Sequence, residues 1–198
     1  MDLLIGTTNP GKLREYVAML AELPLRLVGL RDVGLEAIEV DEPFPTYEDN
    51  ALHKAQQYAR LSGLLALADD SGLEVAALGG RPGVHSARYG GPTDRDRYLK
   101  LLAELDALGA VDRSAVFVCV TAVAHPDGRF ETARGICRGA IAAAPGEGTT
   151  GFGYDAVFIA EGYDRTLNAL SPEEKDQISH RGRAARAIIP ALKRLASL

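Results

Sequence analysis

The chain has 198 residues, of which 46% are apolar and 25% charged, and its 27 acidic and 22 basic residues give a formal net charge of −5. This composition is typical of a globular protein with a substantial core and excludes an intrinsically disordered chain. The acidic excess argues against a general nucleic-acid or membrane surface, because surfaces that bind phosphate polymers usually carry a basic excess. We therefore expect one domain over residues 1–198, with no nucleic-acid and no membrane partner.

Targeting and cysteine patterns indicate a cytoplasmic protein. Residues 1–6 lack the basic start of a signal peptide, and their apolar stretch is too short for one. No window of the chain approaches the length of a transmembrane span. Cys119 and Cys137 have no zinc-binding spacing, so buried, reduced thiols are their expected state.

The N-terminal half alternates predicted strands and helices, an order that favours parallel strand pairing. The predicted elements are, in chain order, a strand over 3–5, a loop over 6–11, a helix over 12–22, a strand over 25–30, an acidic loop over 36–45, a helix to residue 62 and a strand over 64–68. Thr46 is the predicted N-cap of the second helix, with Asp49 as its capping-box partner, and Gly63 supplies the stop.

The C-terminal half adds a predicted hairpin, and hence antiparallel strands, to this pattern. Its predicted elements are a strand over 73–78, a structured loop over 79–92, a helix that Thr93 caps and Gly109 follows, hairpin strands over 115–124 and 130–142, a glycine-rich loop over 146–153, a strand over 156–159, a helix that starts at Ser171-Pro172, and a helix over 182–195. The fold class is therefore α/β with a mixed sheet flanked by helices.

The most informative segment is Asp69-Asp70-Ser71-Gly72, which directly follows the apolar run 64–68. Its residue types predict a turn at the end of a buried strand. Two adjacent carboxylates on a rigid strand end can hold a divalent cation or a water molecule in fixed geometry. The segment indicates a metal-assisted enzyme. Ser71 lacks the G-x-S-x-G pattern of a nucleophilic serine.

The loop Gly6–Lys12 has the two glycines and the lysine of a Walker A motif, but Leu13 stands where that motif needs Ser or Thr. A P-loop NTPase is therefore not expected. Backbone N–H groups at the start of a helix, together with Lys12, can still bind phosphate. A plain strand-to-helix turn is the alternative interpretation.

Acidic and basic side chains elsewhere could complete such a site. Magnesium prefers a few carboxylates together with waters and substrate phosphates, which the acids at Glu39, Asp41, Glu42, Asp69 and Asp70 could provide. Solvated loop acids are the alternative for Glu39 and Asp41. A helical lysine such as Lys54 is more often a solvated cation than a ligand.

Two later segments could contact a flat ligand. Phe152 lies between two glycines and could stack on a base, although a tight turn with the ring in the core is equally compatible with the sequence. His180 and Arg181 are expected in a break between two helices, where their N–H donors suit carbonyl or phosphate oxygens. An ordinary surface pair is the alternative.

Taken together, these segments resemble the inosine triphosphate pyrophosphatase family, the Ham1-like enzymes that act on non-canonical purine triphosphates. The matching stretches are Thr8-Asn9-Pro10-Gly11-Lys12, Glu48-Asp49-Asn50-Ala51 with Lys54-Ala55, Ala68-Asp69-Asp70-Ser71-Gly72-Leu73, Pro82 to Tyr89, Gly151-Phe152-Gly153-Tyr154-Asp155 and Ser179-His180-Arg181-Gly182. They occur in the family's order over nearly the whole chain. The chain departs from the pattern at His85, where the family often has a bulky apolar residue.

The resemblance implies an elongated mixed sheet with two lobes around a central cleft, as in the related Maf proteins, and a homodimer. It also implies a Mg²⁺ cofactor. Asp70 would be the catalytic proton acceptor, and the metal would lie on Glu42 and Asp70, with Asp69 as a further ligand or supporting acid. The residues implied to bind substrate are Thr7, Thr8, Asn9, Pro10, Gly11, Lys12, Lys54, Ser71, Phe152, Gly153, Tyr154, Asp155, Lys175, His180 and Arg181. Glu42 rests on its distance before Lys54, so Glu39 and Asp41 remain competing metal ligands.

The implied reaction is hydrolysis of ITP, dITP and XTP to the monophosphate and pyrophosphate. Donors aimed at O6, for which His180 and Arg181 are candidates, would favour a 6-keto purine over adenine. One alternative is a Maf-type nucleotide pyrophosphatase, against which Asn9 and the segment 179–181 argue. A nucleotide-binding module without catalysis is the other alternative, and the Asp69-Asp70 pair argues against it, because a pure binder gains nothing from acids beside phosphates.

Overall fold

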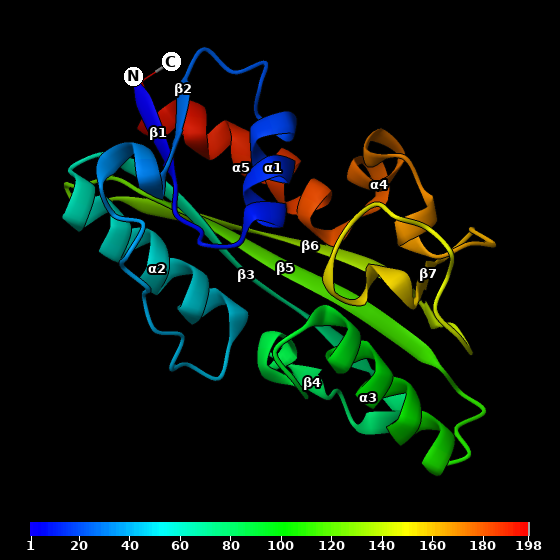
Figure 1. Cartoon of the computed structure of the whole chain (residues 1–198). Coiled ribbons are helices and arrows are strands. Elements are labelled where there is room, and N and C mark those ends of the chain that lie inside the picture. The colour runs from blue at the N-terminus through cyan, green and yellow to red at the C-terminus, as the bar shows by residue number, and fades with distance from the viewer. Residues whose placement is uncertain (198) are drawn as a thin grey trace. The chain divides into compact units, whose positions relative to one another are not determined.

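The computed structural model describes residues 1–197 and divides them into two compact units (Figure 1). Unit 1 contains residues 1–70, 119–135 and 181 onward, and unit 2 contains residues 71–118 and 136–180. The chain therefore crosses between the two units four times, first between Asp70 and Ser71, then after residues 118 and 135, and last between His180 and Arg181.

The elements alternate between strands and helices in the N-terminal half, as predicted. In chain order they are β1 (Asp2–Ile5), α1 (Pro10–Met19), β2 (Arg26–Gly29), α2 (Tyr47–Ser62), β3 (Leu65–Val75), β4 (Pro82–Gly83), α3 (Asp94–Ala107), β5 (Ser114–Ala124), β6 (Phe130–Ile141), β7 (Phe158–Ala160), α4 (Pro172–Ile178) and α5 (His180–Leu195).

The predicted mixed sheet is confirmed. Seven strands are ordered β2-β1-β3-β5-β6-β7, with β4 paired to β3. Strand β1 is parallel to both β2 and β3, whereas the β3–β4 and β6–β7 pairs are antiparallel. The β5–β6 hairpin turns where the N–H group of His125 donates to the carbonyl of Arg129 at 2.8 Å. Parallel strands thus come from the early alternating segment and antiparallel strands from the later one.

The strand β3 differs from the sequence prediction at the most informative segment. A turn over Asp69–Gly72 between strands 64–68 and 73–78 was expected, but β3 runs without a break from Leu65 to Val75. The prediction of strand beyond Val75 is also wrong, because Ala76–Leu78 form a 3₁₀ turn. Acidic, serine and glycine residues disfavour strand only weakly, and tertiary contacts override that preference. The two acids therefore lie within a strand and not at its end.

Helix boundaries were predicted well where capping signals are local. Thr46 caps α2 by accepting the N–H of Asp49 at 3.1 Å, and Gly63 ends the helix in the left-handed conformation. The Asp49 carboxylate accepts from the Thr46 hydroxyl at 2.6 Å. Ser171 caps α4 with Pro172 at its first position, as expected.

Two helix starts differ from the prediction. Helix α1 begins at Pro10, because Asn9 is its N-cap. Helix α5 begins at His180, so His180 and Arg181 form its first turn instead of a break between helices. Only Ser179, in the extended conformation, separates α4 from α5.

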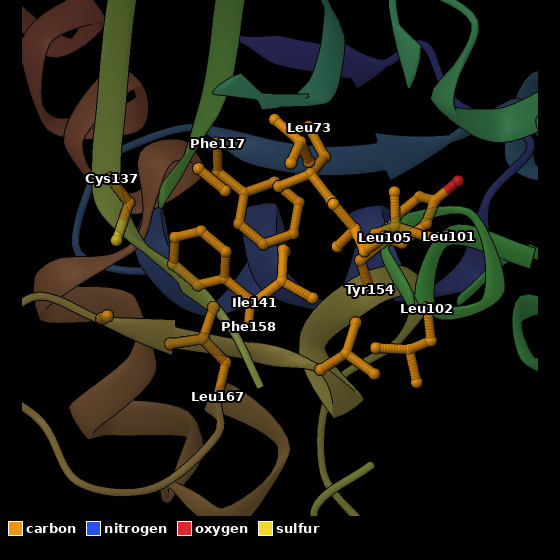
Figure 2. Close-up of a cluster of buried hydrophobic side chains, with 14 of the residues drawn as sticks. Leu73, Leu101, Leu102, Leu105, Phe117, Cys137, Ile141, Tyr154, Phe158 and Leu167 are labelled. Carbon is orange, nitrogen blue, oxygen red and sulfur yellow. The ribbon is translucent and has the colours of Figure 1, made fainter. Parts of the chain in front are cut away.

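Each unit has its own hydrophobic core. In unit 1, Leu3 of β1 and Leu67 of β3 pack against Tyr16 of α1 and Ile188 of α5, and Figure 1 shows α1 and α5 side by side. In unit 2, side chains from α3, β5 and β7 converge (Figure 2). There Phe117 and Phe158 are in contact, with ring centroids 4.6 Å apart.

The cysteine prediction is confirmed: Cys119 and Cys137 are both buried, and neither forms a disulfide. Burial raises the pKa of the Cys119 thiol to about 12. Between residues 1 and 197, no helix combines the length and the apolar character that crossing a membrane requires.

Helix α3 offers a matched test of the unit 2 core. Leu101 is fully buried in that core, whereas Leu99 on the same helix is 39% exposed. We expect Leu101→Ala to lower the free energy of unfolding by about 2–5 kcal/mol, because it leaves a cavity. We expect Leu99→Ala to change it by less than about 0.5 kcal/mol. Urea unfolding followed by circular dichroism measures both, and equal losses would contradict the assignment of the core.

Candidate active site

The residues that the sequence singled out fall into two groups, one in each unit. Unit 1 contains the loop 7–12, Glu42, Lys54, Asp69, Asp70 and Arg181. Unit 2 contains Ser71, Phe152 to Asp155, Lys175 and His180. His180 and Arg181 are thus neighbours in sequence but belong to different units.

The loop between β1 and α1 is organised by Asn9. Its side-chain oxygen accepts the N–H groups of Gly11 at 2.8 Å and Lys12 at 3.2 Å. These two N–H groups were expected to bind phosphate, but they are engaged by the helix cap. Thr8, Asn9 and Pro10 are exposed. The loop therefore presents exposed side chains and directs Lys12 toward β3.

A chain of ion pairs links α1, β3 and the first turn of α5. Lys12 Nζ lies 3.1 Å from Asp69 Oδ1, and Arg181 Nε donates to Asp69 Oδ2 at 3.2 Å. Arg181 also donates through a terminal nitrogen to Glu15 at 2.7 Å. The Asp69 and Arg181 side chains are almost fully buried. Asp69 and Arg181 each have two oppositely charged neighbours, which compensate the buried charge of each side chain.

Asp69 is held in its ionised form. Burial alone would raise the pKa of its carboxyl, but Lys12 and Arg181 outweigh burial and hold that pKa well below its usual range. Burial likewise opposes the charge of Arg181, but Asp69 and Glu15 raise the pKa of its guanidinium well above the ordinary value. Asp69 and Arg181 are thus both charged at physiological pH.

Asp70 lies in a different environment. Asn50 of α2 donates its side-chain N–H to Asp70 Oδ2 at 3.0 Å. Two hydrogen bonds to the backbone of Phe44 in the acidic loop hold the Asn50 side chain. Its oxygen accepts the Phe44 N–H at 2.9 Å, and its nitrogen donates to the Phe44 carbonyl at 3.1 Å. One buried amide therefore links the acidic loop, α2 and β3 around the Asp70 carboxylate.

The protonation of Asp70 shifts in the opposite direction to that of Asp69. Burial raises the pKa of the Asp70 carboxyl above its ordinary value, and the Glu42 carboxylate adds to that increase. Lys54 opposes the increase without cancelling it. A carboxylate with a raised pKa is a stronger base than an ordinary aspartate, and such a group is a candidate proton acceptor.

Lys54 lies among the acids, not in solvent. Its ammonium group donates to Glu42, and the side chain is only 11% exposed. Burial would lower the pKa of Lys54, but the Asp69 and Glu42 carboxylates raise it above the ordinary value. The interpretation of Lys54 as a solvated surface cation is therefore wrong. It is a buried cation in the middle of an acidic cluster.

The geometry bears on which acids could hold a cation. Glu42 is half-buried and paired with Lys54, whereas Glu39 and Asp41 are exposed. Both oxygens of Asp69 are engaged by cations. Among residues 1–197, no three His, Cys, Asp or Glu side chains form a ready metal site. Glu42 and Asp70 together are a carboxylate pair of the kind that binds Mg²⁺ with help from waters and phosphates.

In unit 2, a buried ion pair holds the loop around Phe152. Lys175 Nζ donates to Asp155 Oδ2 at 2.6 Å, and the N–H of Phe152 donates to the same oxygen at 2.8 Å. The N–H of Gly153 donates to Asp94 at 2.7 Å. The Phe152 ring is half-buried, with the Lys175 ammonium 5.0 Å from its centroid. A partly accessible aromatic ring is thus fixed beside a buried cation.

Of the remaining predicted residues of unit 2, Tyr154 and His180 are buried. Tyr154 lies in the core shown in Figure 2, and its hydroxyl donates to the carbonyl of Ser86 at 3.0 Å. His180 stacks on Phe117, with centroids 4.5 Å apart and the rings 7° from parallel. Ser71 is half-buried in β3. The hydroxyl of Tyr154 thus supports the loop from within the core.

Sequence reasoning missed several residues that hold the site. Asn50 was part of a matching stretch but received no role; its spacing of one helical turn from Lys54 on α2 could have indicated it. Glu15 lies three residues after Lys12 on the same face of α1, a similar signal. Asn168 donates to the carbonyls of Gly146 at 3.1 Å and Gly148 at 2.8 Å. No local sequence pattern predicts these two hydrogen bonds.

Comparison with known proteins places this arrangement in a family. A solved Ham1 protein from Coxiella burnetii superposes with a TM-score of 0.86 at 37% identity, covering 98% of this chain and 99% of that one. A dITP/XTP pyrophosphatase structure from Mycobacterium abscessus matches at a TM-score of 0.74 and 43% identity, over 96% of this chain and 100% of that one. The fold is therefore the α/β fold of Ham1 proteins.

The sequence comparisons agree. The Ham1 family model matches residues 3–191. A dITP/XTP pyrophosphatase from Deinococcus deserti is 48% identical over 193 residues, 97% of this chain and 89% of that protein. One from Thermus thermophilus is 47% identical over 195 residues, covering 98% of this chain and 92% of that protein. The chain belongs to the Ham1 family, which confirms the resemblance inferred from its motifs.

Gly151 offers a test of the unit 2 loop. It adopts a φ of +75°, and a Cβ atom there would lie 2.3 Å from the Asp155 carboxylate. Gly162, with a φ of +85°, has nothing near its Cβ position. We expect Gly162→Ala to cost about 1–2 kcal/mol of stability from left-handed strain alone. We expect Gly151→Ala to cost about 1–3 kcal/mol more, because the carboxylate must leave its partners. Chemical denaturation measures both, and equal losses would contradict the interpretation.

Proposed function

We propose that this chain is a nucleoside triphosphate pyrophosphatase that hydrolyses ITP, dITP and XTP to the monophosphate and pyrophosphate. The observation that carries the proposal is the Asp70 carboxylate, buried, oriented by Asn50 and surrounded by Lys54 and Glu42. The names of the curated relatives, dITP/XTP pyrophosphatase, support activity on non-canonical purine triphosphates such as dITP and XTP. The reaction would remove deaminated purines from the nucleotide pool.

Asp70 is the proposed proton acceptor. Attack of water at the α-phosphorus requires a base that orients the water molecule and takes its proton. The hydrogen bond from Asn50 fixes the plane of the carboxylate, so its direction is set before the substrate arrives. The raised pKa strengthens Asp70 as a base relative to its neighbour Asp69. Asp70 therefore supplies what the reaction requires of a base.

Lys12 and Lys54 are the proposed phosphate-binding cations of unit 1. Both side chains form ion pairs with acids of the same cluster, Lys12 with Asp69 and Lys54 with Glu42. Fixed positive charges stabilise the charge that develops on the phosphates and on the leaving pyrophosphate.

The donor set also fits magnesium. Glu42 and Asp70 are the residues that would hold Mg²⁺, and their oxygens are the ligands this ion prefers. Bound Mg²⁺ would supply neutralisation of phosphate charge. With Lys54 paired to Glu42, the carboxylates are already arranged around a positive charge.

The base would be recognised by residues of unit 2. Phe152 is proposed to stack on the purine, with Lys175 and Asp155 fixing the loop that carries it. Donors that face O6 satisfy hypoxanthine and xanthine but meet another donor at the amino group of adenine. One such mismatch costs about 1–3 kcal/mol, which is roughly ten- to a hundredfold in selectivity. His180 is a candidate for such a donor.

A pyrophosphate-release assay across all common and deaminated triphosphates tests the substrate proposal. We expect release from ITP, dITP and XTP with Mg²⁺ at a kcat/KM roughly ten- to a hundredfold above that for ATP. Chelation of the metal should abolish release. Equal turnover of ATP and ITP would overturn the specificity claim. Preferred turnover of pyrimidine triphosphates would favour the Maf-type alternative, and tight binding of ITP without release would favour a binding module. Light scattering of the same sample tests the proposed homodimer.

Asp70→Asn tests the proton acceptor. The amide keeps the shape of the side chain and an oxygen for Asn50, so we expect the fold and the thermal midpoint to persist. We expect kcat to fall by about 10²–10⁴-fold, the usual contribution of a general base. Asp127→Asn, at an exposed ion pair with Arg129, is the matched control and should retain full activity. Wild-type kcat in Asp70→Asn would refute the role.

A further inference from the structure

Four charged side chains of unit 1 form a chain of ion pairs. The proposed reaction does not by itself explain why all four are present. Their order is Lys12, Asp69, Arg181 and Glu15, in which positive and negative charges alternate. Both ends of this chain lie on α1, because Lys12 and Glu15 are three residues apart on one helical face. Asp69 comes from β3 and Arg181 from the first turn of α5. The chain thus joins three elements of one unit.

Asp69 is the centre of this arrangement. Its Oδ1 faces Lys12 at 3.1 Å, and its Oδ2 accepts from Arg181 at 3.2 Å and from the Cys119 thiol at 3.5 Å. The Asp69 side chain is only 1% exposed. Arg181 of α5 and Cys119 of β5 thus donate to Oδ2, whereas Oδ1 has its ion pair with Lys12 of α1. A hydrated cation could bind Asp69 only by displacing partners that compensate its buried charge.

The layer behind Asp69 is also polar and paired. The Tyr16 hydroxyl and the Thr121 hydroxyl are 2.7 Å apart, and both residues are fully buried. The Cys119 thiol lies 3.9 Å from each of these hydroxyl groups. This set fixes the thiol that donates to Asp69. The position of the carboxylate is thus determined from behind as well as from the two cations.

We propose that Asp69 is a positioning residue, which holds the Lys12 ammonium in place for phosphate and ties it through Arg181 to α5, and that it does not bind the metal ion. The inference rests on the proposed function, in which Lys12 contacts phosphate. The alternation of side chains along β3 separates Asp69 from Asp70, so that one acid faces α1 and α5 and the other faces α2. Arg181 acts in the same arrangement by holding Asp69.

A double-mutant cycle between Asp69 and Lys12 tests the proposal. We expect Asp69→Asn and Lys12→Met each to lower kcat/KM for ITP by about ten- to a hundredfold, the loss expected for one charged hydrogen bond. We expect the double variant to be no worse than Lys12→Met alone, because Asp69 acts through Lys12. Losses that multiply in the double variant would overturn the proposal.

Metal binding without turnover provides the second readout. Manganese titration followed by electron paramagnetic resonance measures binding in the absence of nucleotide. We expect Asp69→Asn to keep the wild-type Mn²⁺ affinity within about threefold, and Asp70→Asn to weaken it by about tenfold or more, the 10–100-fold range of metal-site substitutions. A loss of Mn²⁺ affinity in Asp69→Asn as large as that in Asp70→Asn would show that Asp69 is a ligand and overturn the proposal. Asp2→Asn, at the exposed pair with Arg26, is the matched control.

Inorganic pyrophosphate separates this proposal from the proposed function. The affinity for pyrophosphate, measured by calorimetry, should fall by a similar factor in Asp69→Asn and Lys12→Met. This measurement requires no turnover. If the wild type binds pyrophosphate but hydrolyses no triphosphate, the proposed function fails and the positioning role stands. Unchanged pyrophosphate affinity in Asp69→Asn alone overturns the positioning role.

A folding control keeps the test decisive. Asp69→Asn leaves Arg181 without one of its acids, so circular dichroism must show a native spectrum. If it does not, the double variant Asp69→Asn, Arg181→Met removes the buried acid and the buried cation together. This variant still leaves Lys12 without its acid, so the loss of pyrophosphate affinity should persist. Wild-type affinity in the folded double variant would contradict the proposal.

Discussion

The structure depends above all on compensation of the Asp69 charge inside β3. An isolated carboxylate in that position would be strongly unfavourable, because burial removes its hydration. Lys12 and Arg181 supply opposite charge at 3.1 and 3.2 Å and keep the carboxylate ionised within a continuous strand. Because β3 contributes residues 65–70 to one unit and 71–75 to the other, its continuity matters to both units. One of these two cations, Lys12, is also a proposed phosphate-binding residue.

Unit 2 also contains a buried carboxylate whose charge is compensated by a buried cation. Asp155 and Lys175 are buried to the same extent and are paired at 2.6 Å. The Asp155 carboxylate also accepts the N–H of Phe152, so the ion pair determines the loop as well as neutralising its charge. A buried pair of this kind need not add net stability, but removal of one partner leaves an uncompensated charge. In both units, buried ion pairs hold the side chains that are proposed to bind substrate. Removal of one charge would leave its buried partner uncompensated.

The elements that could be predicted closely from the sequence are those whose ends are determined by residues nearby in the chain. Thr46, Gly63 and Ser171 each act within a few residues, so α2 and α4 could be placed closely. The segment 69–72 contains residue types of a turn, but it belongs to β3, which pairs in the sheet with strands distant in sequence. The break expected at residue 180 is shorter than predicted, because only the extended residue Ser179 separates α4 from α5. Family motifs named the candidate residues, but they did not indicate which of these residues contact one another.

The different roles of two adjacent aspartates follow from the geometry of a strand. Successive side chains point to opposite faces, so neighbours in sequence meet unrelated surroundings. At Asp69, Lys12 and Arg181 outweigh burial and the pKa of the carboxyl falls, whereas burial, together with the Glu42 carboxylate, raises the pKa of Asp70. Two titratable groups whose pKa values are driven apart are the usual sign of divided roles in a reaction. The identical chemistry of the two side chains therefore does not imply equivalent roles: Asp69 is suited to hold cations and Asp70 to accept a proton.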